Sequence, residues 1–161
     1  MSQPNIHGEI RPEFGLEVWQ GDQEPPGLSA ARIQRQMDLI LGSKHFRQAK
    51  SLENFLRYVV ARKLAGAENE LKEYTIGVEV FQRGADYDPR HDAVVRVRAN
   101  MLRKRLAGYY QEEGARDELM IELPKGHYVP QFYLRPVSPV SVDLGKLVEE
   151  SAPSLPSSLF V

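Results

Sequence analysis

The segment from residue 92 to residue 111 limits most strongly what this chain can fold into. Its apolar residues recur every three or four positions, which is the spacing of a helix with one face packed against a core. These residues are Val95, Ala99, Leu102, Leu106 and Tyr109. Asp92 and Gly114 are residue types that begin and end helices, so we predict one long helix over residues 92–111.

The predicted long helix is basic: five Lys or Arg residues and no acidic residue lie between Ala93 and Gln111. At about 100° per residue, arginines fall on both flanks of the apolar stripe. Arg96 and Arg103 lie on one flank, and Arg98 and Arg105 lie on the other. The outer face consists of Val97, Asn100, Met101, Lys104 and Gly108.

The arginines either only solvate the edges of the stripe or bind a polyanion. The lack of acidic i, i+4 partners favours the second interpretation.

Other segments predict a β-hairpin and two further helices. LMIEL (119–123) and YVPQFYL (128–134) alternate apolar and polar residues around the turn sequence PKG, as the strands of a hairpin do. Upstream, one amphipathic helix is expected between Ser29 and Gly42. A second is expected to open at Ser51 and to end before Gly66.

Two shorter segments lie before the long helix. EYTIGVEVF (73–81) is rich in β-branched residues, as strands are, yet Thr75 could equally cap a short helix through Phe81. RGADYDPRHD (83–92) is predicted to be a polar loop. In this loop Asp86 and Asp88 are expected to form turns and His91 to be exposed to solvent.

Charge and composition divide the chain into three parts. Residues 1–28 are acidic, and residues 137–161 are acidic and rich in Pro and Ser. Residues 29–136 carry 19 Lys or Arg against 14 Asp or Glu, which favours an anionic partner. We expect one folded domain over residues 29–136 between a flexible acidic arm (1–28) and a flexible tail (137–161).

Several function classes find no support in the residues. No apolar run is long enough for a membrane span, and the N-terminus lacks the apolar region of a signal peptide. The chain has no cysteine, and its four histidines lack the paired spacing of metal ligands, so neither a metal nor a cofactor is expected. No Gly-rich phosphate loop or nucleophile motif is present. We expect a cytoplasmic protein that is not an enzyme.

The long helix and the hairpin together resemble the C-terminal half of DNA-binding domains of the OmpR/PhoB type. In that family a helix of the form V-x-V-x-x-x-x-L-R-x-x-L precedes a hairpin with a Gly- and Tyr-containing turn. The matching residues here are Val95, Val97, Leu102, Arg103, Leu106 and Tyr128. A closer resemblance, over about residues 55–130, is to N-terminal domains of bacterial regulators with the pattern LKEYTIGVEVF…IELPKGxYVP.

The resemblance implies a fold that is mainly α with a C-terminal β-hairpin: a winged helix, with a three-helix core plus a wing. It also favours a helix for residues 73–81. The long helix would enter the major groove, and the hairpin wing would approach the backbone or the minor groove. The residues expected to contact DNA are Arg96, Val97, Arg98, Asn100, Met101, Arg103, Lys104, Lys125 and His127.

Individual contacts follow from the side chains. Arg98 and Arg103 suit phosphates or guanine edges, and Asn100 suits an adenine edge. The sequence departs from the family at Asn100 and Met101, where members often have basic residues, and at Pro124, where the wing commonly has Arg.

The expected function is that of a DNA-binding transcriptional regulator whose partner is double-stranded DNA, held by roughly five phosphate contacts. The alternative is a winged helix that serves as a protein-interaction module. In that case Val97, Met101, Tyr109 and Tyr110 would pack on a partner. A homodimer, and a protein bound through the acidic arm or the C-terminal tail, are further candidate assemblies.

Overall fold

The computed structural model describes residues 27–136, so most of the expected arm and all of the expected tail lie outside the described residues. The described chain is mainly helical and ends in a β-hairpin, which confirms the expected fold class at that level. Its elements are α1 (Ala30–Gly42), α2 (Lys50–Leu64), the 3-10 helix η1 (Glu68–Glu70), α3 (Glu73–Glu79), α4 (Val94–Gln111), β1 (Leu119–Glu122) and β2 (Gln131–Leu134).

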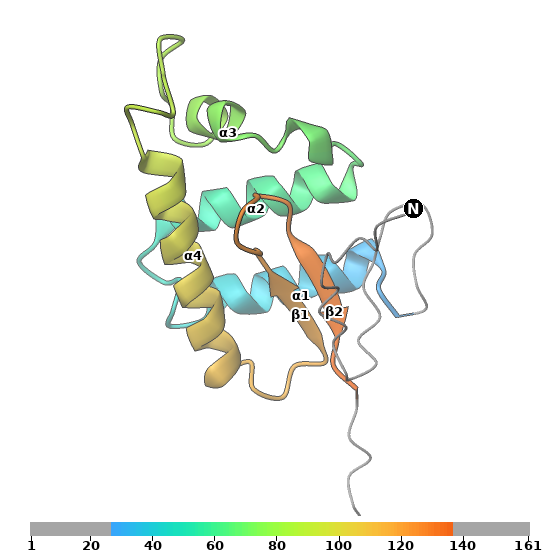
Figure 1. Cartoon of the computed structure of the whole chain (residues 1–161). Coiled ribbons are helices and arrows are strands. Elements are labelled where there is room, and N and C mark those ends of the chain that lie inside the picture. Colours follow the sequence, from blue (N-terminus) through green and yellow to red (C-terminus); the bar gives the residue numbers. More distant parts are fainter. Residues whose placement is uncertain (1–26, 137–161) are drawn as a thin grey trace, which may run out of the picture.

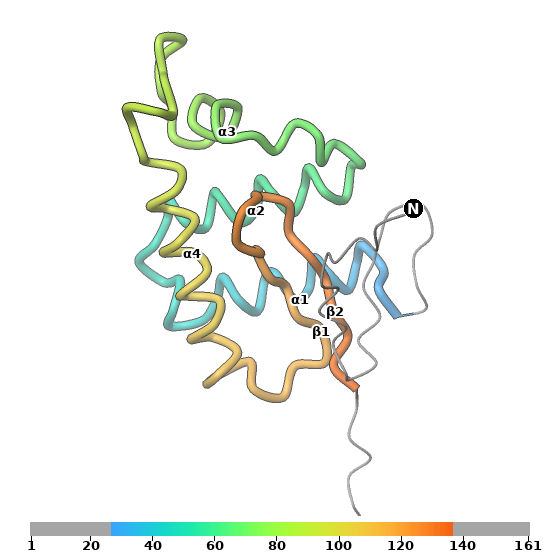
Figure 2. The backbone as a smooth tube through the Cα atoms, in the orientation of Figure 1, coloured from blue at the N-terminus to red at the C-terminus, as the bar shows by residue number. Residues whose placement is uncertain are grey.

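The helices form a stack that α4 crosses at one end. In Figure 1, α1, α2 and α3 lie one above another, and α4 runs across them; α4 contacts α2 and α3. The backbone tube in Figure 2 shows the hairpin returning over α1, and β1 contacts both α1 and α4. The first and last helices are therefore joined through β1. None of the helices within residues 27–136 has the length and apolar character needed to cross a membrane.

The first helix begins as predicted, but the second does not. The Ser29 hydroxyl accepts a hydrogen bond from the N–H of Arg32 over 3.3 Å and so caps α1. The expectation that Ser51 opens α2 is wrong, because the helix begins at Lys50 and Ser51 lies in its first turn. The N-cap is Ala49, and no side chain caps this end of the helix.

The segment 73–81 is helical, as the resemblance implied, but α3 ends at Glu79 and Thr75 lies inside it rather than at its cap. The long helix starts at Val94, two residues later than predicted. Asp92 is not the N-cap residue. Its Oδ1 nevertheless accepts a hydrogen bond from the N–H of Val94 over 3.0 Å, which satisfies one of the free donors at this helix end.

The predicted apolar stripe of α4 is buried, and Tyr110 is buried beside it. It packs in a core to which every helix longer than one turn and both strands contribute. In the antiparallel hairpin, Leu119 lies opposite Leu134 and Glu122 lies opposite Gln131. The second strand begins at Gln131, three residues later than predicted, because Pro130 has no N–H to donate to the ladder.

Candidate nucleic-acid interface

The outer face of α4 is exposed over four of its five predicted residues. Val97 is 54% exposed and Met101 38%, and Asn100 and Lys104 are exposed with them. Gly108 is the exception, because a Cβ at this position would lie 3.0 Å from the His45 ring. We use "outer face" below for Val97, Asn100, Met101 and Lys104.

Two arginines on the flanks of α4 bind groups of the protein itself. Arg96 Nη1 donates to Glu73 Oε1 over 2.9 Å and to the carbonyl of Pro89 over 2.8 Å. Arg105 Nη1 donates to the carbonyl of His45 in the turn after α1. These side chains fix α3, the loop before α4 and the turn after α1 against the long helix.

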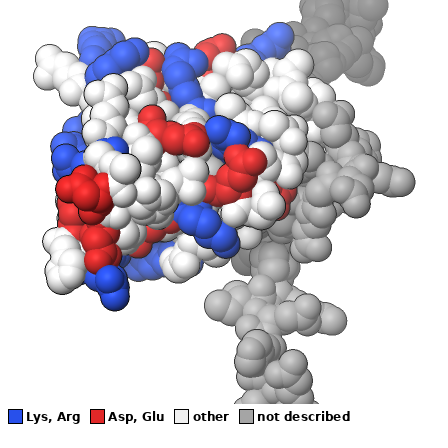
Figure 3. Space-filling model, turned by 90° about the horizontal axis from the view of Figure 1, so that it is seen from above, with Lys and Arg blue, Asp and Glu red and all other residues white. Residues whose placement is uncertain are grey.

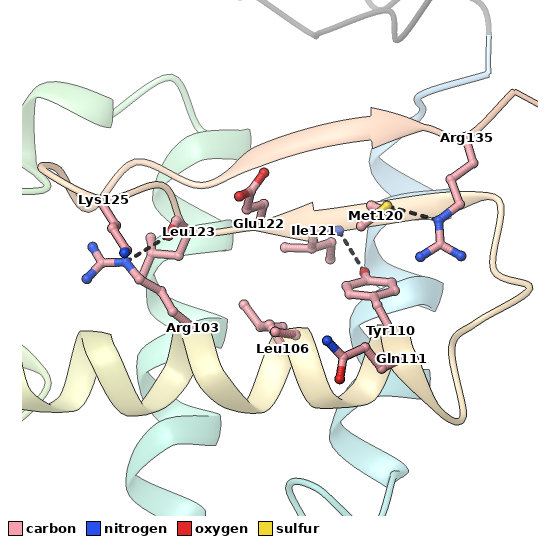
Figure 4. Close-up of a pocket in the computed structure, with 11 residues that line it drawn as sticks. Arg103, Leu106, Tyr110, Gln111, Met120, Ile121, Glu122, Leu123, Lys125 and Arg135 are labelled. Carbon is pink, nitrogen blue, oxygen red and sulfur yellow. Dashed lines mark hydrogen bonds between the residues drawn. The ribbon is translucent and has the colours of Figure 1, made fainter. Parts of the chain in front are cut away.

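Arg103 connects α4 to the loop of the hairpin, residues 123–130, which we call the wing loop. Its Nε donates to the carbonyl of Leu123 over 2.8 Å, and its Nη2 donates to the carbonyls of Pro124 (2.9 Å) and His127 (3.2 Å). Its Nη1 donates to Asn100 Oδ1 over 2.9 Å. Figure 4 shows the guanidinium extending from α4 to the start of the wing loop. Arg103 therefore sets the position of the loop relative to the outer face.

The tip of the wing loop is open to solvent. Lys125 and His127 are both exposed, and Gly126 between them has a φ of 91°, a conformation that favours glycine. Tyr128, one residue further, turns back toward the helices. Burial and the nearby carboxylate of Glu73 raise the pKa of the Tyr128 hydroxyl. The wing loop is thus supported from both α4 and α3.

The other end of the hairpin is held through β1. The Tyr110 hydroxyl accepts a hydrogen bond from the N–H of Ile121 over 2.7 Å, and burial raises its pKa. Arg135 Nε donates to Met120 Sδ over 3.0 Å. Between these contacts and Arg103, an apolar cavity of about 400 Å³ separates α4 from β1 (Figure 4). These side-chain hydrogen bonds add to the packing of the hairpin, whose Ile121 and Phe132 are buried in the core.

Only part of the predicted cationic surface is available to a ligand. On α4 and the wing loop, the cationic side chains that form no hydrogen bond or ion pair with another described residue are Arg98, Lys104 and Lys125. Arg96 and Arg103, also expected to contact DNA, are engaged within the fold as described above. The structure thus divides the expected cations into available and engaged ones, and it places Arg98 and Arg103 against different neighbouring segments.

The polar side chains that lie beside Arg98 belong to no pattern in the sequence. Ser51, Asn54 and Gln82 line a hollow together with Arg98 and Arg83, and we call this site the α2–α4 hollow. Its members come from the start of α2, the segment after α3 and the start of α4. No local motif could have pointed to it, because the residues are separated by up to 47 positions between Ser51 and Arg98.

The face of the molecule on the side of α3 carries charges of both signs. Figure 3, viewed from the top of Figure 1, shows Lys and Arg interspersed with Asp and Glu. Arg62 of α2 pairs with Glu70 of η1 (2.5 Å) and with Glu79 of α3 (3.0 Å). Such paired charges largely cancel at a distance, so they provide no broad positive field. The unpaired cations of α4 and the wing loop are the better candidates for contact with an anion.

The polar loop before α4, residues 83–92, has the structure expected of turns. Asp88 Oδ1 accepts from the N–H of Arg90 over 2.9 Å, and the hydrogen-bonded Arg90 side chain lowers the pKa of the Asp88 carboxyl. His91 is exposed, as predicted. Among residues 27–136, no group of three or more His, Asp or Glu side chains is arranged to hold a metal ion.

Comparison with known proteins gives no match to a family model, to a curated protein or to a solved structure. The geometry of α4 and the wing loop is therefore the basis on which a function can be assigned.

Proposed function

We propose that this chain is a DNA-binding transcriptional regulator of the winged-helix type. In this proposal α4 enters the major groove of double-stranded DNA, and the wing loop lies against the backbone or the minor groove. The supporting observation is the contact of Arg103 with three wing-loop carbonyls, which holds the loop beside an exposed outer face. A helix and loop already fixed relative to each other lose less conformational entropy when they bind.

The outer face also limits how bases would be read. Asn100 Oδ1 accepts from Arg103, while its Nδ2 has no partner among residues 27–136. Nδ2 would therefore donate to an acceptor in the major groove, such as N7 of a purine or O6 of guanine. Val97 and Met101 offer apolar contact to a thymine methyl group. Base recognition in this arrangement depends on one amide and two apolar side chains.

The unpaired cations supply the contacts to phosphate. Arg98, Lys104 and Lys125 give three contacts in place of the roughly five expected from the sequence. Each phosphate contact contributes about −0.9 to the slope of log affinity against log salt concentration, so a slope of about −2.7 is expected. A helix that contacted phosphates with all of its basic side chains would give a steeper slope, so the measured slope distinguishes the two arrangements.

The test is the affinity of the full chain for a mixed-sequence duplex, measured by fluorescence anisotropy at several NaCl concentrations. Binding with a slope near −2.7 supports the proposal. The proposal fails if no duplex, genomic fragments included, is bound in a salt-sensitive way. Selection of bound sequences from random duplexes then measures how far Asn100, Val97 and Met101 discriminate between bases.

A protein-interaction module is the second candidate, and the exposure of Val97 and Met101 favours it. The expectation that Tyr109 and Tyr110 would pack on a partner is wrong. Tyr109 is 3% exposed and Tyr110 8%, and both hydroxyls are hydrogen-bonded within the fold. A partner bound through Val97 and Met101 would be retained at high salt and lost with Met101→Asp, whereas DNA would be released by salt.

A further inference from the structure

The α2–α4 hollow lies on the flank of α4 that faces away from Arg103 and the wing loop. Arg98 is roughly 140° around the helix from Arg103, at about 100° per residue. The hollow has a volume of about 410 Å³ and lies where the first turns of α2 and α4 meet the segment after α3. A ligand in this hollow would therefore be held at the start of α4, on the opposite side from the wing loop.

The polar groups of the hollow lack partners within the fold. The side chains of Ser51, Asn54, Gln82 and Arg98 form no hydrogen bond or ion pair with another residue of the 27–136 range. The fifth polar residue, Arg83, uses its Nε to bind Asp92 Oδ2 over 3.0 Å. No carboxylate lines the hollow. It thus combines a hydroxyl, two amides and two guanidinium groups, of which that of Arg83 is paired with Asp92 and that of Arg98 has no anion beside it among the described residues.

This set of groups matches a tetrahedral oxyanion. A guanidinium donates two parallel N–H bonds to two oxygens of a phosphate, and a hydroxyl and amide N–H groups can donate to the others. A cationic ligand would be repelled by the unpaired guanidinium of Arg98. A neutral ligand would leave the charge of Arg98 without a counterion.

We propose that the α2–α4 hollow binds a phosphate group through Arg98, Ser51 and Asn54. Building on the proposed function, we assign this group to the DNA backbone, on the strand that passes the start of α4. Lys125 of the wing loop lies on the other flank. The helix would then be held in the groove between two backbone contacts, and Arg98 would set its register.

The hollow is tested with inorganic phosphate in a ¹⁵N NMR titration of the full chain, against NaCl at equal ionic strength. Saturable changes in ¹⁵N chemical shift are expected for the backbone amides of Ser51 and Asn54 and for Nε of Arg98. Arg98→Gln should weaken binding at least tenfold, roughly the value of one charged hydrogen bond. Arg35→Gln removes the same charge from α1, outside both the hollow and the proposed DNA interface, and should leave phosphate affinity unchanged. The inference is overturned if NaCl reproduces the shifts, or if they persist in Arg98→Gln.

The source of the phosphate is tested with duplexes in which single backbone phosphates are replaced by neutral methylphosphonates. One replacement should weaken binding of the wild-type chain and have no effect on Arg98→Gln. DNA binding with no phosphate coupled to Arg98 overturns the assignment to the backbone and leaves the proposed function standing. The chain could instead bind inorganic phosphate saturably but bind no duplex. In that case the proposed function fails, and the hollow is a site for free phosphate compounds.

Discussion

Arg103 and Asn100 form a pair on α4 in which Nη1 donates to Oδ1 over 2.9 Å, while the rest of the guanidinium holds three carbonyls of the wing loop. The residue that orients the Asn100 amide is thus the one that positions the wing loop. A change at Arg103 should therefore affect both parts of the proposed interface together.

Replacing Arg103 with Met should release the wing loop without changing the apolar stripe of α4. Hydrogen bonds to charged groups contribute roughly 1.5–3 kcal/mol, but the released carbonyls can reach water, so we expect the free energy of unfolding to fall by about 2 kcal/mol. Urea denaturation measures this loss. Amide hydrogen exchange should become faster in residues 123–134 and stay unchanged in α1.

Lys104→Met is the matched control, because Lys104 is the next residue and has no partner in the described chain. Its effect on the free energy of unfolding should stay within about 0.5 kcal/mol. Equal protection of the wing loop in Arg103→Met and in the wild-type chain would show that Arg103 does not position it.

Tyr110→Phe should destabilise the attachment of β1. The N–H of Ile121 would lose its acceptor in a buried position, at a cost of roughly 1–3 kcal/mol in the free energy of unfolding. Tyr109→Phe should cost less, because Asp117 keeps its 2.6 Å hydrogen bond from Gln36 when the Tyr109 hydroxyl is removed. Thermal unfolding of the two variants in parallel tests this order, and the reverse order would contradict it.

The sequence predicted the parts of the fold that depend on local spacing. The buried stripe of α4 and the hairpin around PKG follow from helical and alternating patterns that a single segment contains. Helix starts were predicted less well. Ser51 and Thr75 are residue types that cap helices, but in each case the chain enters the helix before it reaches them. The backbone of the preceding turn decides this, and side-chain type does not reveal it.

The division of the cations could not be predicted from the sequence. Arg103 binds carbonyl groups 20 to 24 residues away, and every residue has a carbonyl, so no residue type marks the partner. The hollow around Arg98 likewise combines three segments. A helical wheel places both arginines on the flanks of α4 but does not show which of them is engaged within the fold.

Gly77 and Gly42 should respond in opposite directions to substitution by Ala. A Cβ at Gly77 would lie 2.3 Å from Cε1 of the Tyr87 ring, which is buried and stacks on Tyr74. Such overpacking costs about 1–3 kcal/mol. At Gly42, in the last turn of α1, a Cβ meets nothing within 4 Å, so Gly42→Ala should stabilise by up to about 1 kcal/mol. Urea midpoints that move in the same direction would contradict this packing.

Glu112 should make part of the stability depend on acid pH. The hydrogen bond and charge of Lys44, assisted by His45, lower the pKa of the Glu112 carboxyl below 4.5. Because the pKa in the folded state is depressed, this stabilisation is present above the unfolded value and is lost as pH falls through the folded value. Glu112→Gln should therefore make acid unfolding less steep in that range.

The pKa itself can be followed by ¹³C NMR of the Glu112 carboxyl. Lys44→Met should return it toward 4.5, because the group that contributes most to the shift is removed. Arg47 lies near Lys44 in the sequence but forms no ion pair with Glu112. Arg47→Met should therefore leave the titration of Glu112 nearly unchanged. A pKa of Glu112 that is insensitive to Lys44 would contradict the ion pair.

Binding of duplex DNA by the unpaired cations of α4 and the wing loop is tested by the salt dependence of affinity. We compare two double variants: Lys104→Gln/Lys125→Gln and, as the control, Arg35→Gln/Arg116→Gln. The control removes the same charge from α1 and from the turn between α4 and β1 (Figure 1). The first pair should reduce the magnitude of the log–log slope by about 1.8, from about 2.7, and the second should leave it unchanged. Equal losses in both pairs, or a slope that neither pair changes, would contradict the claim.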